Sequence, residues 1–324
     1  MVNAQNNTRQ AVWAALGSAA LIGASIPAAK LIPGSINPWM LAAVMFFGAG
    51  MGLGGWRRVN RRERPMRITA LSRNEKLCMV VGTLLGEVAG PVLLMLGLST
   101  MAAAGTALLL NAEVVFTVLI AWIVFREHVS PRIVLGMVAI VAGGIAVTFS
   151  GIADVKIGWA PVFILGACLC WAVDSNLTRH VTGPDPDWIA MVKSLTASAT
   201  CLLIAETLGA AWPTGHNLAL TLALGAVFYG IGLTLFVVAL RGLGTGRTEA
   251  YFATALFVCA ALLVAIGEPV TVGLVAGGVL MGVGVWLHLG ERHSHQHTHR
   301  AEDGGEPTIH THRHFPDVNH RHSR

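Results

Sequence analysis

The sequence predicts an all-α polytopic membrane protein, with ten transmembrane helices arranged as two inverted five-helix repeats. Of its 324 residues, 54% are hydrophobic and only 12% are charged, whereas about a quarter of the residues in a soluble domain are charged. The mean hydropathy is +0.64. The 37 glycines are typical of helices that pack closely in lipid, where small residues let backbones approach. A soluble protein needs a polar surface, so this composition indicates a membrane helix bundle.

The ten spans follow from length and hydropathy, because a membrane-crossing helix needs about 20 mostly apolar residues. The first five cover residues 12–31, 38–56, 77–98, 101–125 and 131–149. The second five cover residues 158–178, 187–209, 217–240, 245–267 and 270–289. The chain therefore divides into a short N-terminus (1–11), a first five-helix repeat (12–149), a second five-helix repeat (158–289) and a tail (290–324).

The distribution of cationic residues sets the orientation of these spans. The loop between the second and third spans holds Arg57, Arg58, Arg61, Arg62, Arg64, Arg67, Arg73 and Lys76. With ten spans, this loop shares a side with both termini, and the opposite side holds only Lys30 and Lys156. Cationic loops stay in the cytoplasm, so we expect a multi-pass inner (plasma) membrane protein of bacterial type with cytoplasmic N- and C-termini. Orientation explains the net charge of +5 better than binding to nucleic acid does.

The two halves of the chain share a sequence pattern. Phe116 and Glu127 in the first half match Phe257 and Glu268 in the second at a constant offset of 141 residues. Because each half has five spans, an odd number, the two repeats are inverted relative to each other. Inverted repeats are the usual plan of secondary transporters, with a binding site near the midplane between them.

Several motifs carry a resemblance to a known family across residues 12–289. They are Leu110–Thr117 with Phe125–Glu127, Cys170–Arg179, Ala239–Gly244, Gly246–Thr248 and Gly267–Glu268. With these motifs the sequence resembles the drug/metabolite transporter superfamily, in its ten-helix EamA-like branch. The resemblance implies export of small metabolites or drugs by alternating access. The family often has a proline midway along the fourth and ninth helices, and no proline lies near Val114 or Leu256 here.

Two carboxylates stand out at membrane depth, where an ionisable group costs roughly 2.5 kcal/mol or more. Glu87 lies about 15 Å and Glu113 about 18 Å from the cytoplasmic ends of their helices, by helical rise. The sequence leaves open whether Glu87 and Glu113 face each other; if they do, mutual repulsion and desolvation favour the protonated form of at least one carboxyl, which suits proton coupling. The alternative is that each carboxyl is neutral or hydrogen-bonded and stabilises helix packing.

Further polar residues are candidates for the substrate path. Asp174 and Asn176 lie near the cytoplasmic end of the sixth span, where they either line the path or form a cap in which Asp174 pairs with Thr178 or Arg179. Lys193 in the seventh span is interpreted as a cation that extends to the membrane surface. The remaining candidates are Asn111 from the first motif, Tyr229, Arg247 and Tyr251; for Arg247 the alternative is an orientation anchor, and for Tyr229 apolar packing.

The composition changes after Gly290, where nine of the thirteen histidines lie. Gly304, Gly305, Pro307 and Pro316 predict a disordered tail. Alternating histidines of an extended chain share one face, and imidazole binds zinc, nickel, cobalt and copper. The proposed ligands are His293, His295, His297, His299, His310, His312 and His314. The alternative is a basic tail that gains charge as the pH falls toward about 6.

Three functions are consistent with these features. The first is export of small metabolites or drugs, with proton coupling and a metal-binding tail. The second is efflux of divalent nickel, cobalt or zinc, and the third is a non-transporting membrane sensor or scaffold. The sequence carries no nucleophile–base pair or phosphate-binding loop and predicts no enzyme and no required cofactor. The expected partners are a small-molecule substrate and the lipid bilayer, with the oligomeric state left open.

Overall fold

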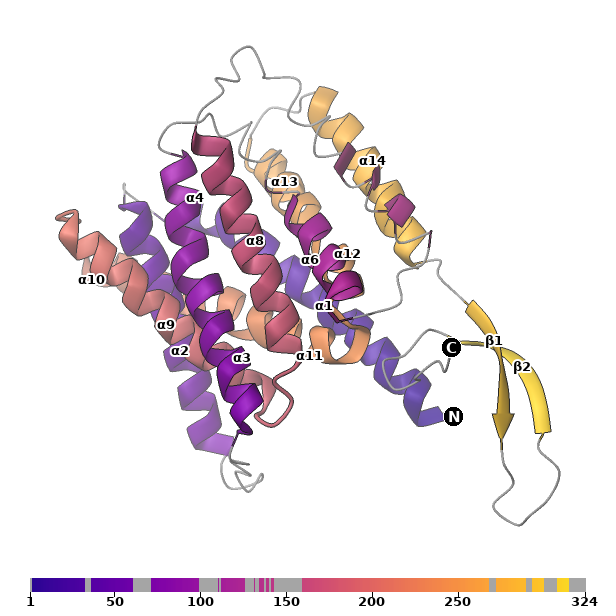
Figure 1. Ribbon diagram of the computed structural model, residues 1–324. Helices are drawn as coiled ribbons and strands as arrows, with labels where there is room; N and C mark the ends of the chain where they lie inside the picture. Colours follow the sequence, from indigo (N-terminus) through magenta and orange to yellow (C-terminus); the bar gives the residue numbers. More distant parts are fainter. Residues whose placement is uncertain are drawn as a thin grey trace.

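The computed structural model describes residues 2–32, 36–60, 71–98, 110, 112–125, 131, 134–136, 138–139, 141–142, 159–267, 272–289, 293–299 and 308–314. Outside the tail, the regular elements of this part of the chain are helices (Figure 1). Those of the first half are α1 (Val2–Lys30), α2 (Pro38–Val59), α3 (Arg73–Thr83), η2 (Leu84–Ala89), α4 (Gly90–Leu98) and α6 (Ala112–Ile123). Those of the second half are α8 (Trp159–Arg179), α9 (Pro186–Thr207), α10 (Gly215–Gly225), η3 (Ala226–Ile231), α11 (Gly232–Leu243), α12 (Thr245–Phe252), α13 (Ala255–Ala265) and α14 (Val272–Leu289).

Within the described residues, six helices are long and apolar enough to cross a membrane. They are Thr8–Ala29, Pro38–Val59, Arg73–Gly97, Trp159–Arg179, Pro186–Thr207 and Gly215–Leu243, which match the first, second, third, sixth, seventh and eighth predicted spans. The fourth span is represented by the shorter apolar helix α6, and the fifth lies mostly outside the described residues. The structure is thus a multi-pass helical bundle, and the full set of ten spans remains a prediction.

The third span begins at Arg73, four residues before the predicted position, because a capping box starts it. The Ser72 hydroxyl accepts a hydrogen bond from the Glu75 backbone, and the Glu75 carboxylate accepts one from the Ser72 backbone. The other carboxylate oxygen of Glu75 accepts hydrogen bonds from the backbones of Thr182 and Gly183 at 3.0 and 2.7 Å. The start of α3 and the end of α8 therefore lie on the same face of the molecule.

A surface ion pair joins the end of α2 to the start of α9. Arg57, in the last turn of α2, contacts Asp187 at 2.5 Å and Asp185 at 3.5 Å, at the start of α9. The end of α2, the start of α3, the end of α8 and the start of α9 thus share one face, which we call the arginine-loop face because the loop from 57 to 73 leaves from it. The end of α1 and the start of α2 lie at the opposite face.

The ninth span is interrupted, although no proline lies near its middle. Its two parts, α12 and α13, are separated by Ala253 and Thr254. The Thr254 hydroxyl donates to the Tyr251 carbonyl at 2.7 Å, and the Thr254 backbone donates to the same oxygen at 3.0 Å. The Tyr251 carbonyl at the break thus accepts two hydrogen bonds, which meets the requirement that backbone polar groups at membrane depth have partners.

The third and eighth spans each contain one π-helical turn, η2 and η3, near the middle. In η2 the Gly90 backbone N–H donates to the Leu85 carbonyl, five residues earlier. Single π turns inside α-helices occur frequently at functional sites. Hydropathy does not predict these π turns. A π turn holds one more residue than an α-helical turn, which changes the backbone hydrogen bonds but not the apolar character of the segment.

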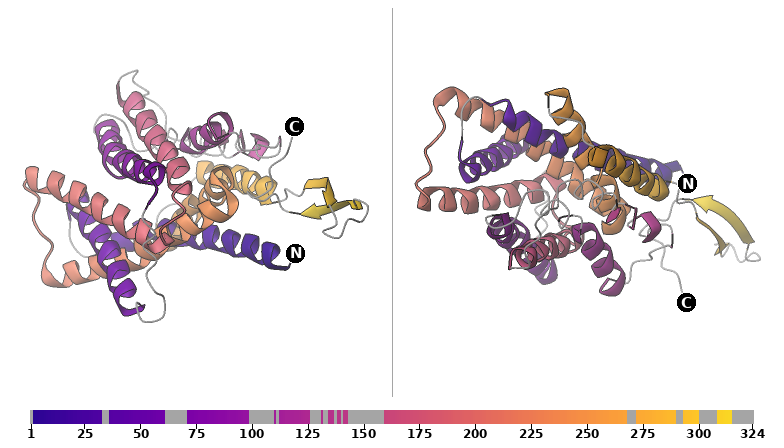
Figure 2. Two further views of the ribbon diagram at one scale, coloured as in Figure 1. Left: turned by 60° about the horizontal axis from the view of Figure 1, so that its bottom comes forward. Right: turned by 90° about the horizontal axis from the view of Figure 1, so that it is seen from above.

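Two histidine-rich segments of the tail form antiparallel strands, β1 (His293–His299) and β2 (Thr308–His314). They form a hairpin outside the helix bundle (Figures 1 and 2). The sequence predicts disorder here, but histidine alternates with Ser, Gln and Thr in β1 and with Thr and Arg in β2. This period of two residues suits a strand. The register pairs His293 with His314, His295 with His312 and His297 with His310.

Candidate functional site

A cluster of charged side chains lies at membrane depth between α8, α9 and η2. The ammonium group of Lys193 contacts both carboxylate oxygens of Asp174 and lies 3.5 Å from Glu87 Oε1. It also donates to the Thr178 hydroxyl at 3.2 Å. The Thr178 hydroxyl in turn donates to Asp174 Oδ1 at 3.0 Å. We call Glu87, Asp174, Thr178 and Lys193 the ion cluster.

Helical spacing and small residues place the ion cluster. Asp174 and Thr178 are four residues apart, so they share one face of α8. That face packs on a stripe of glycines in the third span, Gly82, Gly86 and Gly90. A Cβ atom at Gly86 would overlap the Asp174 carboxylate, and one at Gly82 would lie 2.7 Å from it. The glycines therefore create the space that the carboxylate occupies.

Trp171 ties the π turn to the same helix. Its indole Nε1 donates to the Gly86 carbonyl at 2.9 Å. Trp171 lies three residues before Asp174 and packs over Gly90, where a Cβ atom would lie 2.7 Å from the indole nitrogen. The indole thus supplies a hydrogen-bond partner to a carbonyl inside η2 and holds η2 against α8.

Lys193 is the electrostatic centre of the ion cluster. Its side chain is only 7% exposed, and those of Asp174 and Glu87 are 12% and 13% exposed. A buried cation is tolerated when opposite charges and hydrogen bonds replace its hydration. Two carboxylates on two other elements do so here, so the cluster connects the third, sixth and seventh spans.

Two further carboxylates, Glu113 on α6 and Glu249 on α12, lie near the ion cluster. The charges that act on Glu113 are those of Glu249 and Asp174. Glu249 is 2% exposed; it interacts with the Ser175 side chain, and its Oε1 has no hydrogen-bond partner within the described residues. Glu113 thus lies in the neighbourhood of carboxylates of α8 and α12.

Asn176 joins helices through its amide. Its Nδ2 donates to the carbonyls of Ala172 and Thr117 at 2.8 and 3.1 Å, and its Oδ1 accepts from the Thr245 hydroxyl at 3.1 Å. The residue is 1% exposed. These bonds connect α8 to α6 and α12, so this amide is engaged in packing in this conformation.

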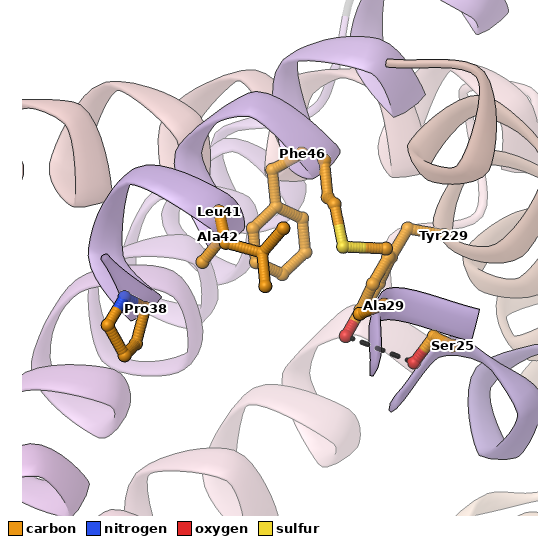
Figure 3. A pocket seen from close by; sticks show the side chains of 8 residues that line it. Ser25, Ala29, Pro38, Leu41, Ala42, Phe46 and Tyr229 are labelled. Atoms are coloured by element: carbon orange, nitrogen blue, oxygen red, sulfur yellow. Dashed lines mark hydrogen bonds between the residues drawn. The ribbon is translucent and has the colours of Figure 1, made fainter. Parts of the chain in front are cut away.

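A pocket of about 300 Å³ lies at the opposite face of the molecule from the ion cluster. Figure 3 shows its lining, with the Tyr229 hydroxyl directed at the Ser25 hydroxyl, 3.4 Å away. Phe46 packs on Tyr229 with the ring centroids 4.7 Å apart. We call it the outer pocket; its lining residues are Ser25, Ala29, Pro38, Leu41, Ala42, Met45, Phe46 and Tyr229. Its chemistry is apolar with one hydroxyl pair.

The structure separates the predicted site residues into groups. Glu87 and Asp174 meet in the ion cluster, Glu113 lies beside it, and Tyr229 lines the outer pocket. Tyr251 is 5% exposed and packs in an apolar cluster between α1 and α11. The half-buried Arg247 lies on α12, and Asn111 lies outside the described residues. Within the part of the chain that the structure describes, no group of three or more His, Cys, Asp or Glu side chains is placed to hold a metal ion.

Sequence reasoning missed the roles of two residues. It interpreted Lys193 as a cation that extends to the membrane surface, whereas Lys193 is directed inward to Asp174 and Glu87. Glu249 was absent from the predicted site because it lies near the start of the ninth span. The signal that was available is charge balance: buried acids in the third and sixth spans require a cation at similar depth, and Lys193 in the seventh span meets that requirement.

The sequence matches the EamA-like transporter family over residues 9–149 and 158–290. An uncharacterized transporter of Methanothermobacter thermautotrophicus is 26% identical over 281 residues, which cover 82% of each chain. A protein of known crystal structure superposes with a TM-score of 0.72 at 18% identity, over 86% of this chain and 98% of the other. At this level of identity, the similarity to the crystal structure shows a shared fold and nothing more.

Proposed function

The chain belongs to the EamA-like transporter family, and from that premise we propose that it exports small metabolites or drugs by alternating access, driven by protons. Membership makes it a multi-pass membrane transporter within the drug/metabolite transporter superfamily and not an enzyme. The location proposed for it is an inner (plasma) membrane, with both termini and the arginine-loop face in the cytoplasm.

An inverted-repeat plan for the transporter is supported by the two π turns. They begin at Leu84 and Ala226, 142 positions apart, close to the offset of 141 between the sequence patterns of the two halves. Each π turn lies near the middle of the third span of its half. Two halves that share such an uncommon local feature at one offset are consistent with duplication, and a substrate path between inverted halves is the plan of many secondary transporters.

The observation that carries proton coupling is the excess of buried acids. Glu87, Glu113, Asp174 and Glu249 can carry four negative charges, and Lys193 contacts two of them, Glu87 and Asp174. Because an unbalanced charge at membrane depth costs roughly 2.5 kcal/mol or more, binding of protons by this group would remove part of that cost. Access of water or substrate would favour release of those protons, and this is the chemical requirement for proton antiport.

Export can be tested in cells through the composition of the medium. Wild-type protein is expected to increase the extracellular level of at least one solute, with an amino-acid panel examined first. Glu113→Gln is expected to abolish that increase, because the amide keeps the shape and cannot exchange a proton. Glu206→Gln is the matched control: Glu206 is exposed and accepts a hydrogen bond from Trp212 at 2.8 Å, which an amide oxygen also accepts. Unchanged export by Glu113→Gln, at equal expression, would remove Glu113 from the mechanism.

Metal efflux is the second candidate, and the register of the tail hairpin favours it. Three histidines of β1 lie opposite three of β2, and imidazole suits zinc, nickel, cobalt and copper. Elemental analysis of metal-stressed cells compares empty vector, the full chain and a chain truncated after Gly290. Lower cellular nickel, cobalt or zinc with the full chain, blunted by truncation, would favour metal efflux. Equal metal content in the three strains would leave metabolite export.

A further inference from the structure

The inverted repeat, which is part of the proposed function, relates the outer pocket to the ion cluster. The last residues of α1 and α8 are 149 positions apart, the first residues of α2 and α9 are 148 apart, and the π turns begin 142 apart. With these three offsets, the first, second and third spans of one half correspond in sequence position to the first, second and third spans of the other half. Each offset comes from element boundaries, independently of the pocket and of the cluster.

Packing supports the same correspondence. The first span of each half contacts the third span of the other half: α1 contacts η3 and α11, and α8 contacts η2 and α4. A Cβ atom on Gly90 would meet Trp171, and one on Gly232 would meet Ile22. Trp171 and Ile22 are 149 positions apart and the glycines are 142 apart, so this contact repeats at the offsets of the elements.

With these offsets, every residue of the ion cluster corresponds to a residue that lines the outer pocket. The pairs are Ser25 with Asp174, Ala29 with Thr178, Met45 with Lys193 and Tyr229 with Glu87. Where one half presents a hydroxyl pair and apolar side chains around a pocket, the other presents two carboxylates held together by an ammonium group. The two sites lie toward opposite faces, as inverted halves require.

The neighbourhood of the ion cluster also contains an unpartnered polar atom. Phe46 of the outer pocket corresponds to Ser194 of α9, which is fully buried, with its hydroxyl lacking a hydrogen-bond partner within the described residues. A buried hydroxyl without a partner is costly. Water would satisfy that hydroxyl if the region around the cluster opened as the outer pocket does.

We propose that the ion cluster closes the counterpart of the outer pocket, a second substrate-access site that opens to the arginine-loop face when Lys193 separates from Asp174 and Glu87. The lining of that site would comprise Glu87, Asp174, Thr178, Pro186, Ile189, Ala190, Lys193 and Ser194. The present conformation has the outer pocket open and this second site closed. The two sites are the alternate entrances of one substrate path.

Thiol labelling tests this proposal without measuring transport. The five native cysteines are replaced, and one reporter is introduced at a time: Ala42→Cys in the outer pocket or its counterpart Ala190→Cys, which is fully buried. N-Ethylmaleimide reports water access, and a membrane-impermeant methanethiosulfonate, applied to right-side-out or inside-out vesicles, assigns the face. The Ala42→Cys reporter is expected to react from the face opposite the arginine loop, and Ala190→Cys to react slowly.

Opening is then produced by removing the cation. Lys193→Met introduces the residue found at the corresponding position of the outer pocket, Met45. This variant is expected to increase labelling of Ala190→Cys about tenfold or more, as expected when a minor state becomes dominant. The new labelling is expected from the arginine-loop face. Asp187→Asn is the matched control, because it breaks an ion pair with Arg57 on the same face outside the ion cluster; it is expected to leave labelling unchanged.

A triple variant guards against misfolding of Lys193→Met. Glu87→Tyr, Asp174→Ser and Lys193→Met together place the outer pocket's residues at the three charged positions and leave no cluster carboxylate unpaired. Slow labelling of Ala190→Cys in both variants, with Ala42→Cys labelled normally, would overturn the second access site. Increased labelling in a protein that exports no solute would retain the access site and reject the proposed function, so the two failures are distinguishable.

Discussion

Lys193 is a cation at membrane depth whose charge is balanced by carboxylates on two other elements. Its burial means that its loss leaves Asp174 and Glu87 close together in an environment of low polarity. Removing one partner of a buried ion pair is costly because the remaining charge keeps its desolvation penalty. The residue therefore stabilises the present conformation, and in the proposed two-state scheme its separation from Asp174 and Glu87 opens the second access site.

At the residue scale, Lys193→Ala is expected to lower the free energy of unfolding by about 3–5 kcal/mol, the cost of leaving buried partners unpaired. The measurement is unfolding in mixed micelles titrated with sodium dodecyl sulfate, followed by tryptophan fluorescence. Lys76→Ala is the control, because Lys76 is exposed near the start of α3 and its loss should be nearly neutral. A Lys193→Ala protein as stable as wild type would contradict the burial of this charge.

At the scale of elements, the contact between η2 and α8 depends on glycine. Gly86 contributes the space for the Asp174 carboxylate and the carbonyl that accepts the Trp171 indole hydrogen bond. Close approach at small residues is how helices associate in lipid. The π turn and the glycine stripe thus act together, since the turn presents Glu87 to Lys193 while the glycines admit Asp174.

Gly86→Ala is expected to separate η2 from α8 and to destabilise the protein by about 1–3 kcal/mol, the range for overpacking a tight contact. Gly55→Ala in α2 is the matched control, since a Cβ atom there meets nothing within 4 Å and alanine favours a helix. The same titration in mixed micelles measures both variants. Equal stability of Gly86→Ala and Gly55→Ala would show that the stripe is not tightly packed.

Sequence patterns predicted the elements better than their contacts. Hydropathy located the long spans because lipid requires about 20 apolar residues, and it located Glu87 and Asp174 as exceptions to that rule. It could not predict that Lys193 turns inward, because the direction of one side chain depends on which helix packs beside it. The π turns were equally hidden, and they determine where Glu87 lies.

At the scale of the whole molecule, the two halves present related frameworks with different chemistry. The outer pocket is neutral and open, while its counterpart is charged and closed, and the carboxylates of α6 and α12 lie beside the charged one. Because only one of the two sites contains carboxylates, this asymmetry would make transport respond to the proton concentration on one side of the membrane. Family membership was predictable from the motifs, whereas this asymmetry required knowing which helices pack together.

The most direct test of proton-driven export is proton movement in proteoliposomes. Purified protein is reconstituted with the pH dye pyranine inside, and the solute identified from the medium of expressing cells is added to one side under a pH gradient. Wild type and Glu206→Gln are expected to show a pH change that depends on that solute, and Glu113→Gln to show none. Solute uptake with no accompanying proton movement in the wild type would contradict the account.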